Sequence, residues 1–144
     1  MTQVDFYIIE SEADDARLKL TCRIADKAVR EKQHVFINSP SESEARKLDE
    51  LLWTFLQGSF IPHRIVEKPL DEAPLEPVII GLAQEPAGQR WDLLVNLAAD
   101  VPEFFSRYAR VAEVVDADSA RREQSRERYR FYRDRGYPLS TREV

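Results

Sequence analysis

Glycine is scarce in this sequence, which has only four glycines among 144 residues. None of them lies in segment 8–17, IIESEADDAR, where the first predicted strand passes into a loop. Nucleotide-binding α/β folds place a glycine-rich loop at this point, because its backbone N–H groups must come close to a phosphate. The acids of the segment would also repel a phosphate, and no Walker-type motif occurs. The sequence thus argues against a nucleotide-dependent enzyme, a hypothesis that thermal stabilisation by added nucleotides would test.

Cysteine and histidine are also rare, and neither indicates a metal site. Cys22 is the single cysteine, so an internal disulfide is impossible, which fits a reducing compartment. It lies among apolar residues at helical spacing, and we interpret it as a core residue and not as a nucleophile. His34 and His63 have no Cys or His companion at ligand spacing. We therefore expect no metal and no other cofactor.

Long apolar runs are absent as well. The longest, near Val78 and Leu93, are far too short to cross a bilayer. The first residues do not form a signal-peptide pattern, because they lack a basic region and an apolar stretch of sufficient length. These absences predict a cytoplasmic protein without membrane contact.

Side chains arranged for catalysis are missing too. The adjacent acid pair Asp49 and Glu50 does not converge on one site, since neighbouring helix positions face apart, and the pair at 71–72 lies in a predicted loop. We interpret both pairs as solvated surface and expect no catalytic residues. The net charge of −5 also argues against a protein whose whole surface binds nucleic acid, so any such contact must be local or indirect.

Hydrophobic patterning predicts a single α/β domain. Short apolar runs such as VDFYII at 4–9 are typical of buried strands, and amphipathic segments such as 13–32 are typical of helices. About five strands alternate with four helices, which predicts a three-layer α/β/α Rossmann-like domain with a mostly parallel sheet. We expect the domain to span 1–144, with a flexible tail over 137–144 after the helix-ending Gly136. The other predicted strands are 34–38, 78–82, 93–97 and 110–116, and the other predicted helices are about 41–55, 102–110 and 118–135.

The last predicted helix is unusually rich in arginine. From Asp118 to Val144 the sequence has eight arginines and five acids, so this segment is basic within an acidic chain. At 100° per residue, one stripe of the helix combines arginines with a tyrosine. Arginine offers a planar fork for carboxylates and stacks on aromatic rings. The stripe consists of Arg122, Arg126, Tyr129 and Arg133, with Arg130 alongside.

Two interpretations of this helix remain open. One is a solvated helix stabilised by Glu–Arg pairs, such as Glu123 with Arg126 and Glu127 with Arg130. The other is a binding surface for an acidic peptide or a nucleic-acid backbone, with aromatic side chains adding specificity. The overall acidity of the chain favours the peptide. Binding of single-stranded nucleic acid by this basic helix is the alternative function.

A second candidate surface lies in segment 48–64, LDELLWTFLQGSFIPHR. This segment puts several large apolar side chains at the junction of a predicted helix and a loop. We interpret Phe55 and Ile61 as core residues. Trp53 and Phe60 lie closer to the loop and favour an aromatic patch of the kind that dominates protein interfaces.

Three segments of the chain resemble the chi subunit of bacterial DNA polymerase III, which is part of the clamp-loader complex. They are VDFYII at 4–9, LDELLW followed by SFIPH within 48–63, and RERYRFYRDRGYPL at 126–139. The resemblance covers essentially the whole chain. It implies a three-layer α/β/α domain without catalytic activity of its own, although the nucleotidyltransferase activity of the whole polymerase can be assigned to it.

The resemblance also implies two protein partners, with DNA contacted indirectly. One is the acidic C-terminal tail of single-stranded DNA-binding protein, which ends in aspartates and a terminal phenylalanine. Its binding residues would be Arg122, Arg126, Tyr129, Arg130 and Val115. Better-known members have lysines at the positions of Arg122 and Arg130, a difference that should preserve the charge. The other partner is the psi subunit, which not every bacterium with chi contains, and its binding residues would be Trp53, Phe60, Pro62 and His63.

Overall fold

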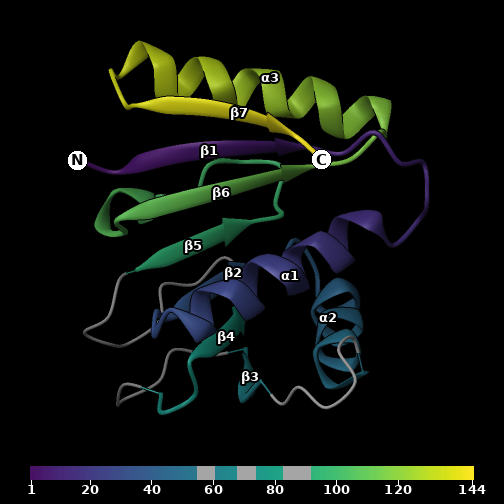
Figure 1. The fold of residues 1–144 in the computed structure, drawn as a ribbon. Helices are drawn as coiled ribbons and strands as arrows, with labels where there is room; N and C mark the ends of the chain where they lie inside the picture. Colours follow the sequence, from purple (N-terminus) through teal and green to yellow (C-terminus); the bar gives the residue numbers. More distant parts are fainter. Residues whose placement is uncertain (55–60, 68–73, 83–91) are drawn as a thin grey trace.

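The computed structural model of the chain describes residues 1–54, 61–67, 74–82 and 92–144. In these residues the chain forms one seven-stranded sheet, in which every pair of neighbouring strands is parallel. The strand order is β3-β4-β2-β5-β6-β1-β7 (Figure 1). The strands are β1 Gln3–Ile8, β2 Val35–Asn38, β3 His63–Val66, β4 Val78–Gly81, β5 Leu93–Asn96, β6 Arg110–Val115 and β7 Leu139–Glu143, and the helices are α1 Ala16–Arg30, α2 Glu42–Thr54, the 3₁₀ turn η1 Phe105–Arg107 and α3 Ser119–Asp134.

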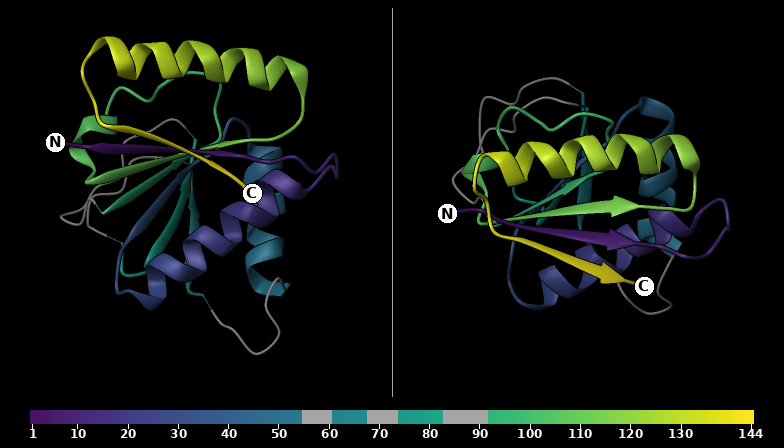
Figure 2. Two further views of the ribbon diagram at one scale, coloured as in Figure 1. Left: turned by 45° about the horizontal axis from the view of Figure 1, so that its top comes forward. Right: turned by 90° about the horizontal axis from the view of Figure 1, so that it is seen from above.

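Helices cover both faces of the sheet, which confirms the predicted three-layer α/β fold. Helices α1 and α2 lie on one face, and α3 lies on the other (Figure 2). Each face has its own hydrophobic core: Cys22 and Leu48 belong to the core under α1 and α2, whereas Phe6 and Tyr132 belong to the core under α3. Cys22 is fully buried, as predicted, and burial raises the pKa of its thiol to about 12.

The central strands form where short apolar runs are buried on both sides. All four residues of β2, β4 and β5 are buried. Such runs occur in parallel sheets because helices cover both faces. β1 instead alternates, with Val4 and Phe6 on the α3 side and Asp5 and Tyr7 on the α1 side. No helix in the described part of the chain is long and apolar enough to cross a membrane.

The structure has more strands than predicted, and the expectation of a flexible tail over 137–144 was wrong. Gly136, with φ of +79°, ends α3, and the Tyr137 N–H donates to the Tyr132 carbonyl at 3.1 Å. The chain then turns back, and β7 adds to the edge of the sheet beside β1. The segment LSTRE carries little apolar character, so its strand depends on pairing with β1, which hydrophobic patterning does not detect.

The expected helix over 102–110 was also wrong, since only η1 is helical there and β6 already begins at Arg110. The aromatic residues that suggested a helix are all buried in the core under α3. Phe105 packs edge-to-face against Tyr132, with 5.2 Å between the ring centroids. Packing of these rings therefore determines the backbone here more than helix propensity does. These aromatic residues are Phe104, Phe105 and Tyr108.

Candidate protein-interaction surfaces

Helix α3 begins and ends close to the predicted residues. The Asp118 carboxylate accepts a hydrogen bond from the Arg121 N–H at 2.9 Å, which caps the helix N-terminus. The Arg121 guanidinium in turn donates to both oxygens of Asp116, at 2.9 and 2.8 Å. The first turn of α3 is therefore attached to the end of β6.

The inner face of α3 carries a buried polar network that the sequence analysis missed. Arg128, only 6% exposed, donates to Glu113 Oε1 at 2.9 Å, and the Tyr132 hydroxyl donates to Glu113 Oε2 at 2.7 Å. Asn96 on β5 donates to both oxygens of the same carboxylate, at 3.1 and 3.0 Å. Burial raises the pKa of Glu113, but its donors oppose that shift by stabilising the carboxylate. This network fixes the rotation of α3 about its axis.

The outer face of α3 presents two arginines around a tyrosine, as predicted. Arg126 and Arg130 are exposed, and within the described part of the chain neither forms an ion pair. The Glu–Arg pairs expected for a purely solvated helix are therefore not formed. Tyr129 is half-buried, and its ring lies edge-on against Phe6 of β1, with 5.3 Å between the centroids.

The other two arginines of the predicted stripe behave differently. Arg122 turns towards the sheet, where its Nε donates to the Asp116 carbonyl at 3.0 Å and its Nη2 donates to the Ile9 carbonyl at 3.1 Å. The expectation that its guanidinium projects from the helix was therefore wrong. Arg133 is exposed and pairs with the neighbouring Asp134 at 3.2 Å.

Val115, the apolar residue assigned to the same site, is only 1% exposed at the end of β6. It lines a cavity of about 260 Å³ together with Arg121 and Gln124 on α3. The structure thus places Val115 beneath the first half of α3 and not on the open surface. It can contact a ligand only through that cavity.

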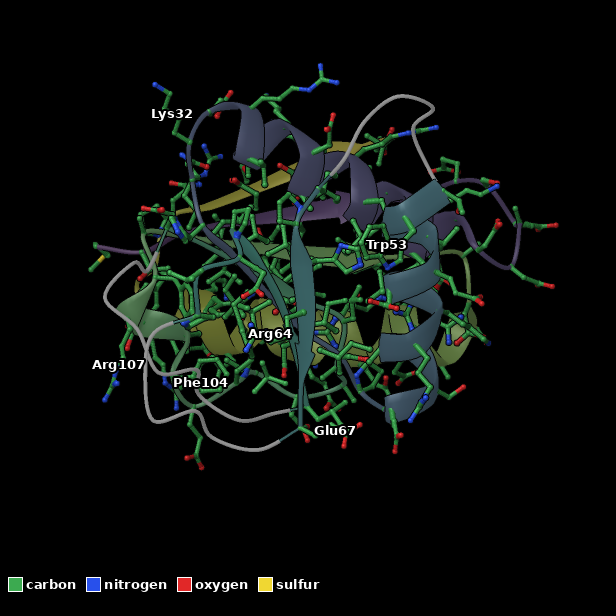
Figure 3. All side chains as sticks on the ribbon, turned by 90° about the horizontal axis from the view of Figure 1, so that it is seen from below. Lys32, Trp53, Arg64, Glu67, Phe104 and Arg107 are labelled. Carbon is green, nitrogen blue, oxygen red and sulfur yellow. The ribbon has the colours of Figure 1, made fainter. Side chains whose placement is uncertain are left out.

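The second predicted surface lies at the end of α2 beside β3. Trp53, which is labelled in Figure 3, is 54% exposed. Its ring centroid is 4.8 Å from that of His63. Pro62 is half-buried next to them, and Ile61 is buried as predicted. Phe60 and Phe55 lie outside the described residues. Trp53 is thus the exposed residue of this surface, with Pro62 partly exposed, whereas the His63 side chain is fully buried beneath them.

Each ring nitrogen of His63 lies close to an oxygen atom. Its Nδ1 is 2.6 Å from the Ile61 carbonyl oxygen, and its Nε2 is 3.0 Å from Asp49 Oδ1. We had interpreted Asp49 as solvated surface, whereas the structure places its carboxylate against the imidazole. Asp49 therefore helps to orient the ring on which Trp53 packs.

Comparison with known proteins identifies the family. The family described as "DNA polymerase III chi subunit, HolC" matches residues 1–140. The DNA polymerase III subunit chi of Pseudomonas aeruginosa is 42% identical over 139 residues, which cover 96% of this chain and 94% of that protein. The proteins of the same name from Haemophilus influenzae and Escherichia coli are 32% and 31% identical, over 96% and 98% of this chain and over 95% and 97% of their own length.

The chain belongs to the DNA polymerase III chi family. Chi is a subunit of the replicative polymerase assembly, so membership places the chain in DNA replication, with partners inside the replication complex. In the residues that the structure describes, no three His, Cys, Asp or Glu side chains are grouped to hold a metal ion. The residues that contact each partner of this chi-family chain remain predictions.

Proposed function

We propose that this chi-family protein is a non-catalytic, cytoplasmic adaptor that connects the clamp loader, through a psi subunit, to the acidic tail of single-stranded DNA-binding protein. The observation that carries the proposal is the outer face of α3, where two exposed guanidiniums, neither of them ion-paired within the residues that the structure describes, flank Tyr129. Such a surface is unusual in a chain whose net charge is −5. It suits a partner that is itself acidic.

The proposed tail contact divides into charged and apolar parts. Arg126 and Arg130 would donate charge-assisted hydrogen bonds to the aspartates of the tail. Tyr129, supported from below by Phe6, would pack against the terminal phenylalanine. Arg122 would act indirectly, because its guanidinium already attaches α3 to the ends of β1 and β6.

The proposed psi contact lies at the end of α2. An exposed tryptophan with a preoriented ring next to it is typical of an interface hot spot. Trp53 supplies the exposed ring, and the buried imidazole of His63 supports it, so that His63 would act indirectly; Pro62 and Phe60 are the further predicted contacts. The two proposed sites lie on different elements, α3 and α2, so both partners can bind at once.

Calorimetric titration with a peptide that ends in two aspartates and a terminal phenylalanine tests the tail contact. We expect a dissociation constant of the order of micromolar that weakens as salt is added. Arg126→Ala combined with Tyr129→Ala should weaken binding by about 1–3 kcal/mol, because charge-assisted bonds and ring packing are lost together. Arg30→Ala, which removes one exposed arginine from α1, is the control and should bind normally. Unchanged affinity in the double variant would refute the site.

The alternative is that α3 binds single-stranded nucleic acid directly. The same exposed arginines motivate it, whereas the net charge of −5 argues against it. Titration with a fluorescent oligonucleotide separates the two functions. Tight oligonucleotide binding that Arg126→Ala abolishes would favour the alternative.

A further inference from the structure

A second basic surface lies on the opposite face of the sheet from α3. Helix α1 crosses this face of the sheet diagonally (Figure 2), and β7 forms the edge of the sheet beside β1. The space between α1 and the neighbouring strands β1, β6 and β7 is an open groove of about 280 Å³. We call it the α1 groove. Its charged and aromatic lining comprises Asp5, Tyr7, Arg23, Lys27, Glu31, Arg110 and Arg142.

Cations line both walls of the α1 groove. Arg23 and Lys27 are one turn apart on α1, so they share one face of the helix, and both are exposed. Arg110 and Arg142 reach the groove from β6 and β7 on the opposite wall. A ligand lying in the groove would therefore meet positive charge on both sides.

The carboxylates of the groove offset only part of this charge. Asp5, which is 3% exposed, accepts from both Arg110 and the Ser140 hydroxyl. Burial tends to raise the pKa of Asp5, but these hydrogen bonds outweigh burial and leave the pKa below its ordinary value. Asp5 is thus committed to Arg110, and Glu31 is the other acid among the described lining residues. Those described residues include four cations and two carboxylates, so the lining as a whole carries a net positive charge.

An aromatic ring lies on the floor between these walls. Tyr7 is half-buried on β1, and the Arg142 guanidinium carbon is 5.6 Å from the centre of its ring. A guanidinium over an aromatic ring makes a flat surface on which nucleobases stack. The groove therefore combines charge for a backbone with a stacking surface for bases.

We propose that the α1 groove binds the sugar–phosphate backbone of single-stranded nucleic acid, with bases stacking on Tyr7 and Arg142. Positive charge along a groove together with an aromatic platform is how single strands are bound without sequence preference. A peptide of acidic residues alone, such as poly-glutamate, would satisfy the charge but would leave the stacking surface unused. This site is separate from the outer face of α3, because the two lie on opposite faces of the sheet.

Fluorescence anisotropy with a labelled oligo-dT strand at low salt tests the proposal on the full chain. Wild-type protein should bind, and Arg23→Ala combined with Lys27→Ala should bind more weakly. For single strands, each phosphate contact contributes about 0.7 to the steepness with which the logarithm of the association constant falls against the logarithm of the salt concentration. The double variant loses two contacts, so its slope should be about 1.4 less steep than that of the wild type. Tyr7→Leu should weaken binding without changing that slope, because it removes stacking and leaves the charge.

A matched control is Lys19→Ala combined with Arg30→Ala, which removes the same charge from α1 outside the groove lining. This control should retain the wild-type salt dependence of oligo-dT binding. Thermal unfolding should show that all variants are folded. The proposal is wrong if wild-type protein does not bind oligo-dT, if the control loses as much slope, or if only Arg126→Ala affects binding. It is also wrong if groove variants lose binding to poly-glutamate but not to oligo-dT.

Discussion

The two faces of α3 use arginine in opposite ways. On the inner face, Arg128 is buried and both ends of its guanidinium have acceptors, the Glu113 carboxylate and the Ala99 carbonyl. On the outer face, Arg126 is exposed, and it has no ion-pair partner among the described residues. The two positions are two residues apart, so the helix turns them to different sides. The same residue type therefore stabilises the fold on one side and remains available for a partner on the other.

The largest effect should come from breaking the inner pair. Arg128→Ala leaves the Glu113 carboxylate buried without its cation, which typically costs about 3–5 kcal/mol. Arg126→Ala is the matched change on the outer face and should alter stability by no more than about 0.5 kcal/mol. Urea denaturation gives both free energies of unfolding. If both variants lost the same free energy of unfolding, Arg128 and Arg126 would not differ in their contribution to stability, and the comparison of the two faces of α3 would fail.

A smaller loss of stability is expected from a change at Arg122, whose guanidinium attaches α3 to the ends of β1 and β6. Arg122→Ala removes two hydrogen bonds from a charged donor to the Asp116 and Ile9 carbonyls, so the free energy of unfolding should fall by about 1.5–3 kcal/mol. Arg122→Lys should recover only part of this, because an ammonium lacks the fork that reaches both oxygens. Full recovery by lysine, again measured by urea denaturation, would mean that charge alone matters there.

The smallest change in stability should come from the ion pair of Arg121 with Asp116, which anchors the first turn of α3, and this change should depend on pH. Burial tends to raise the pKa of Asp116, but the hydrogen bonds from Arg121 outweigh burial and hold the pKa below its ordinary value of 3.8. The pair therefore stabilises the fold above that pH and loses its contribution as pH falls through the lowered pKa. Arg121→Ala should cost up to about 1 kcal/mol at neutral pH, because Arg121 is partly exposed, and almost nothing in strong acid. Urea denaturation at both pH values measures the difference, and an equal cost at both would contradict it.

The sequence predicted the parts of the fold that depend on local patterning. VFI and VIIG are continuous apolar runs, and they lie in strands whose residues are all buried. LSTRE has no such pattern, and it forms β7 only because β1 offers an unpaired edge. Segment 102–110 was mistaken for a helix because its aromatic spacing resembles an amphipathic pattern, whereas its rings fill the core between sheet and α3.

In the candidate site, too, the sequence predicted what depends on local patterning and missed what depends on residues distant in the chain. Helical phasing was enough to group Arg126 and Tyr129 with Arg130 alongside, but it also placed Arg122 in the stripe, whose guanidinium the structure directs to the strand ends. It could not identify Arg128 as structural, since its partner Glu113 lies 15 positions away on β6. A glutamate within the buried strand RVAEVV was the available signal, because a buried acid requires a partner.

Calorimetric titration of the acidic tail peptide against Arg126→Glu combined with Arg130→Glu tests the central claim most directly. The comparison protein is Arg23→Glu combined with Lys27→Glu, which makes the same change in net charge on the opposite face of the sheet. The account predicts that the α3 variant stays folded and loses detectable peptide binding, while the α1 variant binds with an affinity close to wild type. Equal weakening in both variants would contradict it, because binding would then depend on net charge and not on the outer face of α3.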